Sequence, residues 1–236
     1  MEDGLDEMAA IIPGVDLANR DRTALMIIDM QYHDAWPERG MTAAWEKRFP
    51  GSMAYYNERL RETTIPAIRG LLDFFRAEGR PVIHVVLGSD YQDLRDCPPR
   101  FRDWTRNLEK TAGIDDVWWT GNDDFAVVDE LKPHPGETVI RKTTNGAFNG
   151  SDIDRTLQRM QISGLVITGV VTSACVETTA RDAADRGYDC VLVSEACADY
   201  EQEMHDATLK AFRLYFGRVL DTTNDAISAL RSGACV

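Results

Sequence analysis

Short runs of apolar residues alternate with amphipathic stretches along most of this chain. Such runs, rich in valine and isoleucine, predict strands that are buried on both faces, as in a parallel sheet. Five runs have this character: Ala24–Ile28, Pro81–Leu87, Glu137–Ile140, Leu165–Val171 and Cys190–Val193. A further, short strand is expected around Arg218–Asp221.

The stretches between these runs carry apolar side chains at helical spacing. Pro66–Ala77, for example, places Ile68, Leu71 and Phe75 on one face. Strands that alternate with helices predict an α/β fold, with three layers, doubly wound, and helices on both faces of a parallel sheet. Ligands of such folds bind beyond the carboxyl ends of the strands. Further helices are expected over Ser151–Met160, Thr172–Arg186 and Glu201–Phe216, and from Thr223 onward.

Two segments interrupt this alternation, Tyr32–Met53 and Asp90–Phe125. Both are longer than ordinary loops and rich in Trp, Asp, Arg and Pro, which is typical of functional lids or of segments that contain small helices. The chain has no internal repeat and no clear linker. The sequence therefore predicts one domain over residues 23–232, preceded by an N-terminal arm over residues 1–22.

Composition narrows the classes of partner. A net charge of −13 on 236 residues argues against nucleic acid and anionic membranes, because both repel such a protein. The longest apolar run, Leu165–Val171, is too short to cross a bilayer, and the first ten residues are acidic where a secretory signal is basic. Five cysteines without a CxxC pair favour reduced thiols, and hence a cytoplasmic protein. They are Cys97, Cys175, Cys190, Cys197 and Cys235.

Cys175 has the most informative setting of these cysteines. It follows the strand that ends at Val171 and falls in the first turn of the next helix. The partial positive charge of a helix N-terminus favours a thiolate, so we expect a lowered thiol pKa. The free N–H groups there can also stabilise an oxyanion. The alternative is a small, buried apolar cysteine, which is how we interpret Cys190 inside the next strand.

Three motifs, in this order, resemble the isochorismatase-like cysteine hydrolase superfamily. This superfamily includes nicotinamidases, N-carbamoylsarcosine amidohydrolases, biuret hydrolases and ureidoacrylate amidohydrolases. The resemblance extends from Thr23 to Leu230. The motifs are TALMIIDMQ (Thr23–Gln31), VIRKTTNGAF (Val139–Phe148) and GVVTSACVETTARDAADRGY (Gly169–Tyr188).

The resemblance implies a six-stranded parallel sheet and a catalytic triad of Asp29, Lys142 and Cys175. Asp29 would be the acid and base, Lys142 the stabilising cation and Cys175 the nucleophile. The N–H groups of Val171 and Cys175 would form the oxyanion hole, next to a cis peptide bond between Val170 and Val171. Members of the superfamily are commonly homo-oligomers, so a dimer or tetramer is expected. Taken singly, Asp29 could cap a turn and Lys142 could be solvated; their conjunction with Cys175 favours catalysis.

The histidines bear on metal dependence. The metal-dependent nicotinamidases of this superfamily carry an Asp-x-His pair and a further histidine. None of the four histidines here, His33, His84, His134 and His205, forms that pattern. The prediction is therefore no metal and no cofactor, and nicotinamidase activity is not expected. His84 is interpreted as a core histidine, whereas His33 is close enough to Asp29 in sequence to reach the pocket.

The predicted activity is cleavage of a C–N bond in a small amide, ureide or N-carbamoyl compound, through a thioester on Cys175. Alternatives are an isochorismate-type ether hydrolase, disfavoured because those relatives lack the cysteine, and a non-catalytic ligand-binding relative. A dehydrogenase would need a glycine-rich turn where the chain reads DMQYHDAW. The predicted substrate-binding residues are Gln31, Trp36, Phe148 and Thr172, with Val171 and with Trp118 or Trp119 as further candidates.

Overall fold

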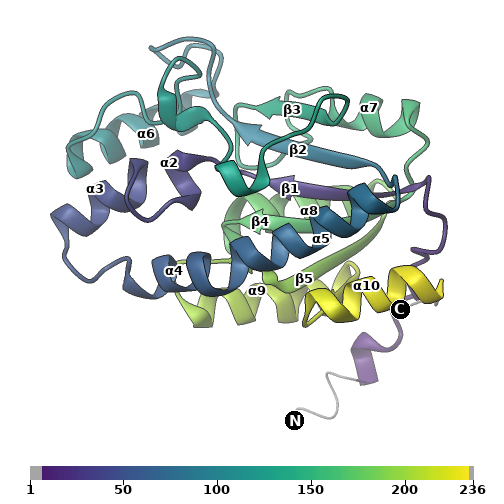
Figure 1. Cartoon of the computed structure of the whole chain (residues 1–236). Coiled ribbons are helices and arrows are strands. Elements are labelled where there is room, and N and C mark those ends of the chain that lie inside the picture. Colours follow the sequence, from purple (N-terminus) through teal and green to yellow (C-terminus); the bar gives the residue numbers. More distant parts are fainter. Residues whose placement is uncertain (1–6, 234–236) are drawn as a thin grey trace.

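The computed structural model describes residues 7–233 and places six parallel strands in one sheet (Figure 1). The strands lie in the order β3-β2-β1-β4-β5-β6. The predicted six-stranded α/β fold is thereby confirmed. The strands are β1 (Thr23–Ile28), β2 (Val82–Leu87), β3 (Thr138–Lys142), β4 (Gly164–Val170), β5 (Asp189–Ala198) and β6 (Arg218–Leu220).

Helices cover both faces of the sheet and extend beyond one of its edges (Figure 1). The α-helices are α2 (Tyr32–Ala35), α3 (Gly40–Arg48), α4 (Ala54–Arg59), α5 (Ile65–Ala77), α6 (Pro99–Ala112), α7 (Ile153–Arg159), α8 (Glu177–Asp185), α9 (Gln202–Tyr215) and α10 (Thr223–Ser232). The structure also contains two π-helical turns, η1 (Leu60–Thr64) and η4 (Thr172–Val176), and two 3₁₀ turns, η2 (Asp123–Phe125) and η3 (Asp129–Leu131).

Strand β1 shows how the apolar runs build two cores. Successive side chains of a strand point to opposite faces, and every residue of β1 is buried. Leu25 and Ile27 pack with α5 and α10 on one face. Ala24, Met26 and Ile28 pack with α7, α8 and α9 on the other. A continuous apolar run is therefore the pattern that a central strand between two helical layers requires.

Two elements differ from the prediction. Strand β5 continues to Ala198, beyond the predicted end at Val193, because after a shift of register its second half pairs with Gly169 and Val170 of β4. The helix expected over Thr172–Arg186 begins with the π-helical turn η4 and continues as α8. Both differences lie at the carboxyl edge of the sheet, where the nucleophile was predicted.

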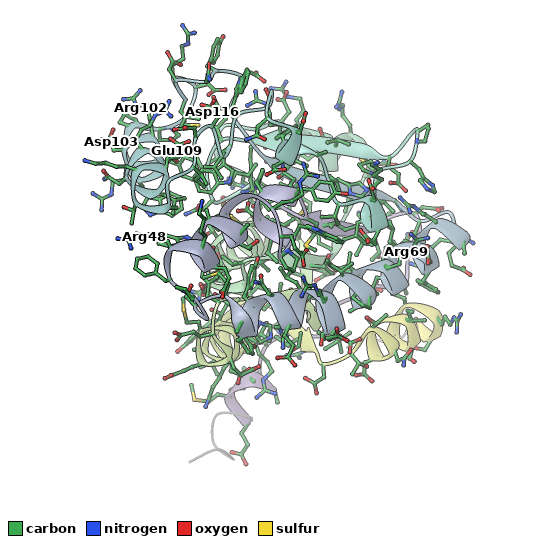
Figure 2. All side chains as sticks on the ribbon, turned by 60° about the vertical axis from the view of Figure 1, so that its left-hand side comes forward. Arg48, Arg69, Arg102, Asp103, Glu109 and Asp116 are labelled. Atoms are coloured by element: carbon green, nitrogen blue, oxygen red, sulfur yellow. The ribbon has the colours of Figure 1, made fainter. Side chains whose placement is uncertain are left out.

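The two long segments between strands contain helices, as expected. Helices α2 and α3 lie in the first segment and α6 in the second, and α3 contacts α6 beyond the carboxyl ends of the strands (Figure 1). Charged residues of α6 such as Arg102 and Asp103 lie at this end of the molecule together with Asp116 (Figure 2). Beneath them is a small separate core formed by Met41, Leu87, Leu108, Val117 and Trp118. These helices form a cap over the strand ends.

The described part of the N-terminal arm packs against the domain. Val15 and Leu17 are buried in the same core as α5, and the side chain of Arg218 donates to the carbonyls of Ala9 and Ile12 at 3.0 and 2.6 Å. Cys235 and the first six residues lie outside the described residues.

A partly buried carboxylate joins helix α5 to strands β2 and β3. Glu137 accepts hydrogen bonds from Arg76 at 2.7 and 3.0 Å and from the His134 amide at 2.8 Å, and it lies 2.9 Å from His84 Nε2. His84 is thus a core histidine, as interpreted above, with a charged partner. Burial by itself raises the pKa of Glu137, but these bonds outweigh burial and lower the pKa to about 2.

Replacing this carboxylate should destabilise the fold in a pH-dependent way. We expect Glu137→Gln to lower the free energy of unfolding by about 1–3 kcal/mol at pH 7, because charged hydrogen bonds are lost. A carboxylate with a depressed folded pKa stabilises above its unfolded pKa of 4.5 and loses that stabilisation as the pH falls toward 2. Urea denaturation should therefore show a smaller difference at pH 3 than at pH 7. The exposed Glu130→Gln variant is the control, and an equal effect of both variants at pH 7 contradicts the prediction.

Candidate active site

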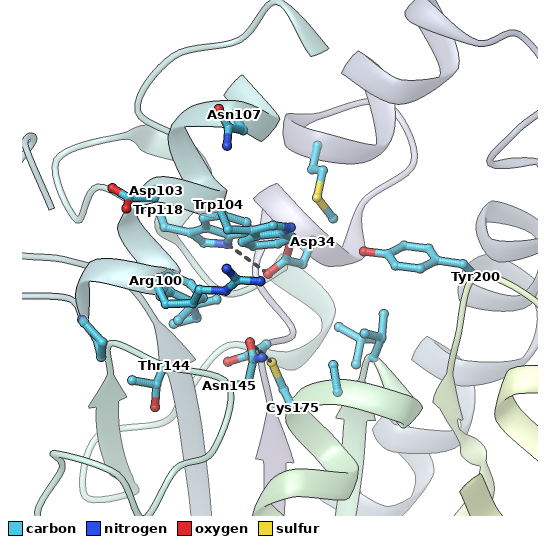
Figure 3. Close-up of a pocket in the computed structure, with 18 residues that line it drawn as sticks. Asp34, Arg100, Asp103, Trp104, Asn107, Trp118, Thr144, Asn145, Cys175 and Tyr200 are labelled. Atoms are coloured by element: carbon cyan, nitrogen blue, oxygen red, sulfur yellow. Dashed lines mark hydrogen bonds between the residues drawn. The ribbon is translucent and has the colours of Figure 1, made fainter. Parts of the chain in front are cut away.

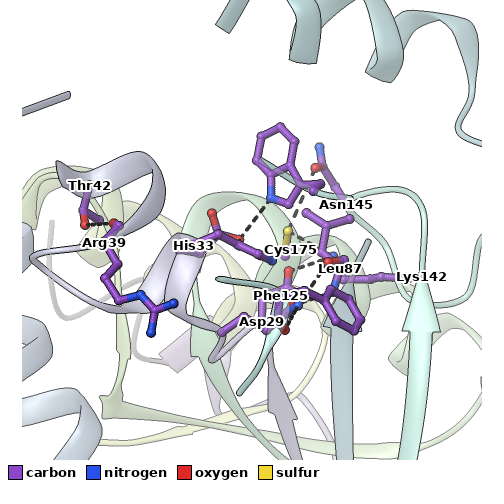
Figure 4. Close-up of polar contacts among 12 residues, drawn as sticks. Asp29, His33, Arg39, Thr42, Leu87, Phe125, Lys142, Asn145 and Cys175 are labelled. Carbon is purple, nitrogen blue, oxygen red and sulfur yellow. Dashed lines mark hydrogen bonds and ion pairs between the residues drawn. The ribbon is translucent and has the colours of Figure 1, made fainter. Parts of the chain in front are cut away.

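The three residues of the predicted triad lie in contact at the carboxyl edge of the sheet (Figure 4). Asp29 follows β1, Lys142 ends β3 and Cys175 lies in η4. Lys142 Nζ is 2.7 Å from Oδ2 of Asp29 and 3.3 Å from Sγ of Cys175. The side chains of Lys142 and Asp29 are 0 and 1 % exposed. The arrangement is therefore an ammonium group placed between a carboxylate and a thiol, away from bulk water.

The turn after β1 directs Asp29 into this site. Its backbone is in the left-handed region with φ of 53°, a conformation that Asp tolerates better than most residues. Its N–H still donates to the Val85 carbonyl at 2.8 Å, which holds it to β2. On the neighbouring strand, Gly169 has φ of 118°, and a Cβ there would lie 2.0 Å from the Ile28 carbonyl oxygen. The glycine in the third motif therefore lets β4 approach β1 beside the site.

Polar contacts from β5 and α9 hold the turn that carries Cys175. The Ser173 N–H donates to Oδ2 of the buried Asp199 at 2.6 Å. Oγ1 of Thr172 is 2.8 Å from Nδ1 of His205, which is also buried. The peptide bond between Val170 and Val171 is cis. The turn that carries Cys175 is thus held by Asp199, which follows β5, and by His205 of α9.

The expectation of a lowered thiol pKa is wrong. Burial raises the pKa of Cys175 well above its ordinary value, and the Asp29 carboxylate raises it further, while Lys142 opposes both. Burial also raises the pKa of Asp29, against the effect of Lys142. For Lys142, burial lowers the pKa, but Asp29 and Cys175 outweigh it, so its pKa is raised. The site therefore holds a protonated thiol and a protonated lysine beside a carboxylate of increased basicity.

A cavity of about 670 Å³ opens above Asp29 and Cys175 (Figure 3). Its walls come from the cap as well as from the strand ends. Phe101 and Trp104 of α6 line it together with Trp118, and Tyr200 lies on the opposite side. Asn145 is close to the thiol, with its Oδ1 3.9 Å from Cys175 Sγ. The candidate triad thus lies at the bottom of a pocket with aromatic walls.

The four residues predicted to bind substrate do not line this cavity. Gln31 is fully buried, and its amide bonds to the backbone of Leu87 and Phe125 at distances from 2.7 to 3.2 Å. It therefore joins the first strand to the cap. Trp36 packs on the core around α5 and edge-on to Tyr32.

The other two predicted residues also have structural partners. Phe148 lies in the core beneath α8 and beside Tyr188. Thr172 directs its hydroxyl to His205, away from the cavity lining. Of the further candidates, Val171 and Trp118 line the cavity, whereas Trp119 does not. His33 is fully buried behind the lining, with Nδ1 2.9 Å from Oδ2 of Asp34.

Phe101, Trp104 and Asp34 line the cavity but were not predicted from the sequence as site residues. The spacing of Phe101 and Trp104, three residues apart on α6, was a signal, because such residues share one face of a helix. Nothing in the sequence around Asp34 shows that its carboxylate is buried at a cavity. These residues become functional candidates only because the cap folds back over the strand ends.

Within residues 7–233, no group of three or more His, Cys, Asp or Glu side chains is arranged to hold a metal ion. No helix in the same range combines the length and apolar character that crossing a bilayer requires.

The sequence matches known proteins over most of its length. Residues 23–224 match the isochorismatase domain. The ureidoacrylate amidohydrolase RutB of Stutzerimonas stutzeri is 32 % identical over 206 residues, which cover 84 % of this chain and 78 % of that protein. The ureidoacrylate amidohydrolase RutB of Agrobacterium fabrum is 28 % identical, with 91 and 92 % covered.

Two solved structures extend this likeness to the fold. A cysteine hydrolase from Pseudomonas syringae pv. phaseolicola has a TM-score of 0.75 at 25 % identity and covers 94 % of this chain and 99 % of its own. The N-carbamoylsarcosine amidase of Thermoplasma acidophilum has a TM-score of 0.61 at 25 % identity, with 86 and 97 % covered.

Proposed function

The chain belongs to the isochorismatase family of hydrolases, and we propose that it cleaves the C–N bond of a small amide, ureide or N-carbamoyl compound through a thioester on Cys175. The observation that carries this proposal is the position of Lys142 Nζ, 2.7 Å from Asp29 and 3.3 Å from Cys175 at the bottom of the cavity. The curated relatives named ureidoacrylate amidohydrolase support a substrate with an amide or ureide bond.

In the first half-reaction, the thiol needs a base because burial keeps it protonated. Asp29 accepts the thiol proton as Sγ attacks the carbonyl carbon, and it then passes that proton to the leaving nitrogen. The C–N bond breaks, ammonia or an amine departs, and the acyl or carbamoyl group remains on Sγ. The N–H groups of Val171 and Cys175 are the proposed donors to the oxyanion.

In the second half-reaction, water replaces the amine. Asp29, ionised again, takes a proton from water, and the resulting hydroxide attacks the thioester carbon. The C–S bond breaks, the thiolate recovers the proton from Asp29, and the acid or carbamate departs. Lys142 stays protonated throughout, because Asp29 and Cys175 raise its pKa, and it stabilises each anion that forms beside it.

The test of this function is ammonia release from a panel of amides and ureides. The panel contains ureidoacrylate, N-carbamoyl amino acids, biuret, maleamate and nicotinamide, each incubated with the protein after dialysis against EDTA. We expect turnover of at least one ureide or carbamoyl compound, unchanged by the chelator. Turnover that disappears with EDTA and returns with a divalent metal contradicts a metal-independent mechanism.

The pH dependence of turnover tests the role of Asp29. The carboxylate must be ionised to accept the thiol proton, and burial raises its pKa. We therefore expect kcat/KM to rise with pH through a value above the ordinary aspartate pKa of ~3.9. Steady-state rates from pH 4 to 9 measure this limb, and circular dichroism at each pH controls for unfolding. A rate that is constant down to pH 4 in the folded protein means that Asp29 is not the base.

A further inference from the structure

Asp34 supplies a second carboxylate to the cavity, and the mechanism above does not use it. Asp34 lies in α2, where the chain enters the cap, and it is only 8 % exposed. Its Oδ2 accepts a long hydrogen bond of 3.4 Å from Trp118 Nε1 and lies 2.9 Å from His33 Nδ1. Within residues 7–233, no group donates a hydrogen bond to its Oδ1, and the residue lines the cavity (Figure 3). A buried carboxylate with an open acceptor favours a donor from a ligand.

Three aromatic rings form a wall beside this carboxylate. Trp104 and Trp118 are stacked, with centroids 5.2 Å apart and planes 19° apart. Phe101 lies 5.7 Å from Trp104 and 5.5 Å from Trp118. All three rings line the cavity, and Trp118 is the one that donates a hydrogen bond to Asp34. The face of an aromatic ring attracts cations, most strongly for tryptophan.

Apart from His33, which lies behind the lining, no buried basic side chain is paired with Asp34 in the described residues. Asp29 is paired with Lys142. Arg100 and Asp103, on the first turns of α6, also line the cavity, but both are exposed and of opposite sign. Solvent and salt screen exposed charges more than buried ones, so Arg100 and Asp103 weaken the attraction of Asp34 for a cation less than buried charges would.

We propose that Asp34 and the aromatic wall of Phe101, Trp104 and Trp118 form a cation subsite, so that the amide cleaved at Cys175 carries an ammonium group or a comparable organic cation. Asp34 contributes to the raised pKa of both Asp29 and Cys175. Asp34 and Cys175 line the same cavity, so one small molecule can reach both. The proposal rests on the proposed function only for the reaction at Cys175, because binding of a cation requires no turnover.

Binding of three probes of nearly equal size tests this subsite without any reaction. Calorimetry measures the affinity of Cys175→Ala protein for benzylamine, benzyl alcohol and phenylacetate at pH 7, where they are cationic, neutral and anionic. We expect benzylamine to bind about tenfold more tightly than either of the others, from the ion pair and the aromatic faces. Its advantage should decrease as salt is added.

Variants assign the preference to named residues. Asp34→Asn keeps the size of the side chain and an acceptor for Trp118, and we expect it to remove the preference for benzylamine. Asp103→Asn, which removes an exposed charge from the same cavity, should change the preference by less than about threefold. Trp104 is 51 % exposed, so Trp104→Leu should fold normally and weaken benzylamine binding several-fold more than benzyl alcohol binding.

Two results overturn the cation subsite. One is an equal or greater affinity for phenylacetate in the unmodified cavity, a measurement that does not depend on the folding of any Asp34 variant. The other is a preference for benzylamine that survives in folded Asp34→Asn. Glycinamide, a cationic amide at pH 7, is added to the amide panel to separate the two proposals. No turnover of the panel and of glycinamide, with a retained preference for benzylamine, would locate the error in the proposed reaction at Cys175.

Discussion

Alanine in place of Cys175 is expected to lower kcat/KM for amide hydrolysis by about 10⁴-fold or more. The substitution removes the atom that would carry the acyl group, and neither Asp29 nor Lys142 can form a thioester in its place. The fold should tolerate the change, because only a small side chain is shortened and the polar contacts of the turn come from Thr172 and Ser173. Ammonia release from the best substrate of the panel measures the loss.

A second measurement separates a nucleophile from a residue that only shapes the cavity. Acid quenching of the wild-type reaction followed by mass spectrometry should find the acyl or carbamoyl mass on the peptide that contains Cys175. Cys97→Ala is the matched control, because Cys97 is also buried but does not line the cavity. Hydrolysis by Cys175→Ala at more than a few per cent of the wild-type rate contradicts the thioester mechanism.

Methionine in place of Lys142 is expected to affect both stability and turnover. The substitution leaves the Asp29 carboxylate buried without its counter-ion, and breaking a buried ion pair in this way costs about 3–5 kcal/mol of unfolding free energy. The same change leaves the thiolate formed during turnover without its adjacent cation, so kcat should fall by about 10³-fold. Urea denaturation and steady-state kinetics measure the two effects.

The double variant Asp29→Asn/Lys142→Met gives the decisive comparison. Because it removes both charges, it should recover most of the stability that Lys142→Met loses, and it should remain inactive. Lys132→Met, which removes an exposed lysine paired with Asp129, is the control and should change stability by less than about 1 kcal/mol. Equal stability of Lys142→Met and the wild type would mean that the buried ion pair is not maintained in solution.

The sheet could be predicted from the sequence because it depends on local patterns, whereas the candidate triad was predicted from the resemblance of three motifs to the isochorismatase-like superfamily. Apolar runs such as Ala24–Ile28 are typical of central strands. The parallel arrangement brings the carboxyl ends of these strands to the same edge of the sheet. Asp29 and Lys142 follow or end such strands, so their meeting with Cys175 needs no knowledge of the loops. The extension of β5 to Ala198 was missed because it depends on a shift of register against β4.

The cavity wall and the ionisation of the thiol could not be predicted in the same way. Gln31 has an amide suited to binding substrate, but two backbone segments that are distant in sequence take up its hydrogen bonds. Phe101 and Trp104 reach the cavity only because α6 packs on α3. For Cys175, the position near the start of a helix was predicted correctly. Burial in the folded protein nevertheless raises the pKa of the thiol, and the extent of burial depends on packing.

The origin of the aromatic wall bears on how this enzyme can diversify. Phe101, Trp104 and Trp118 all come from the single segment between β2 and β3, whereas Asp29, Lys142 and Cys175 come from β1, β3 and η4. We therefore expect changes in that segment, including insertions and deletions, to alter substrate choice while the strand ends keep the proposed reacting groups in place. Exchange of residues 90–125 with those of a homologue should accordingly transfer substrate specificity without disturbing the sheet.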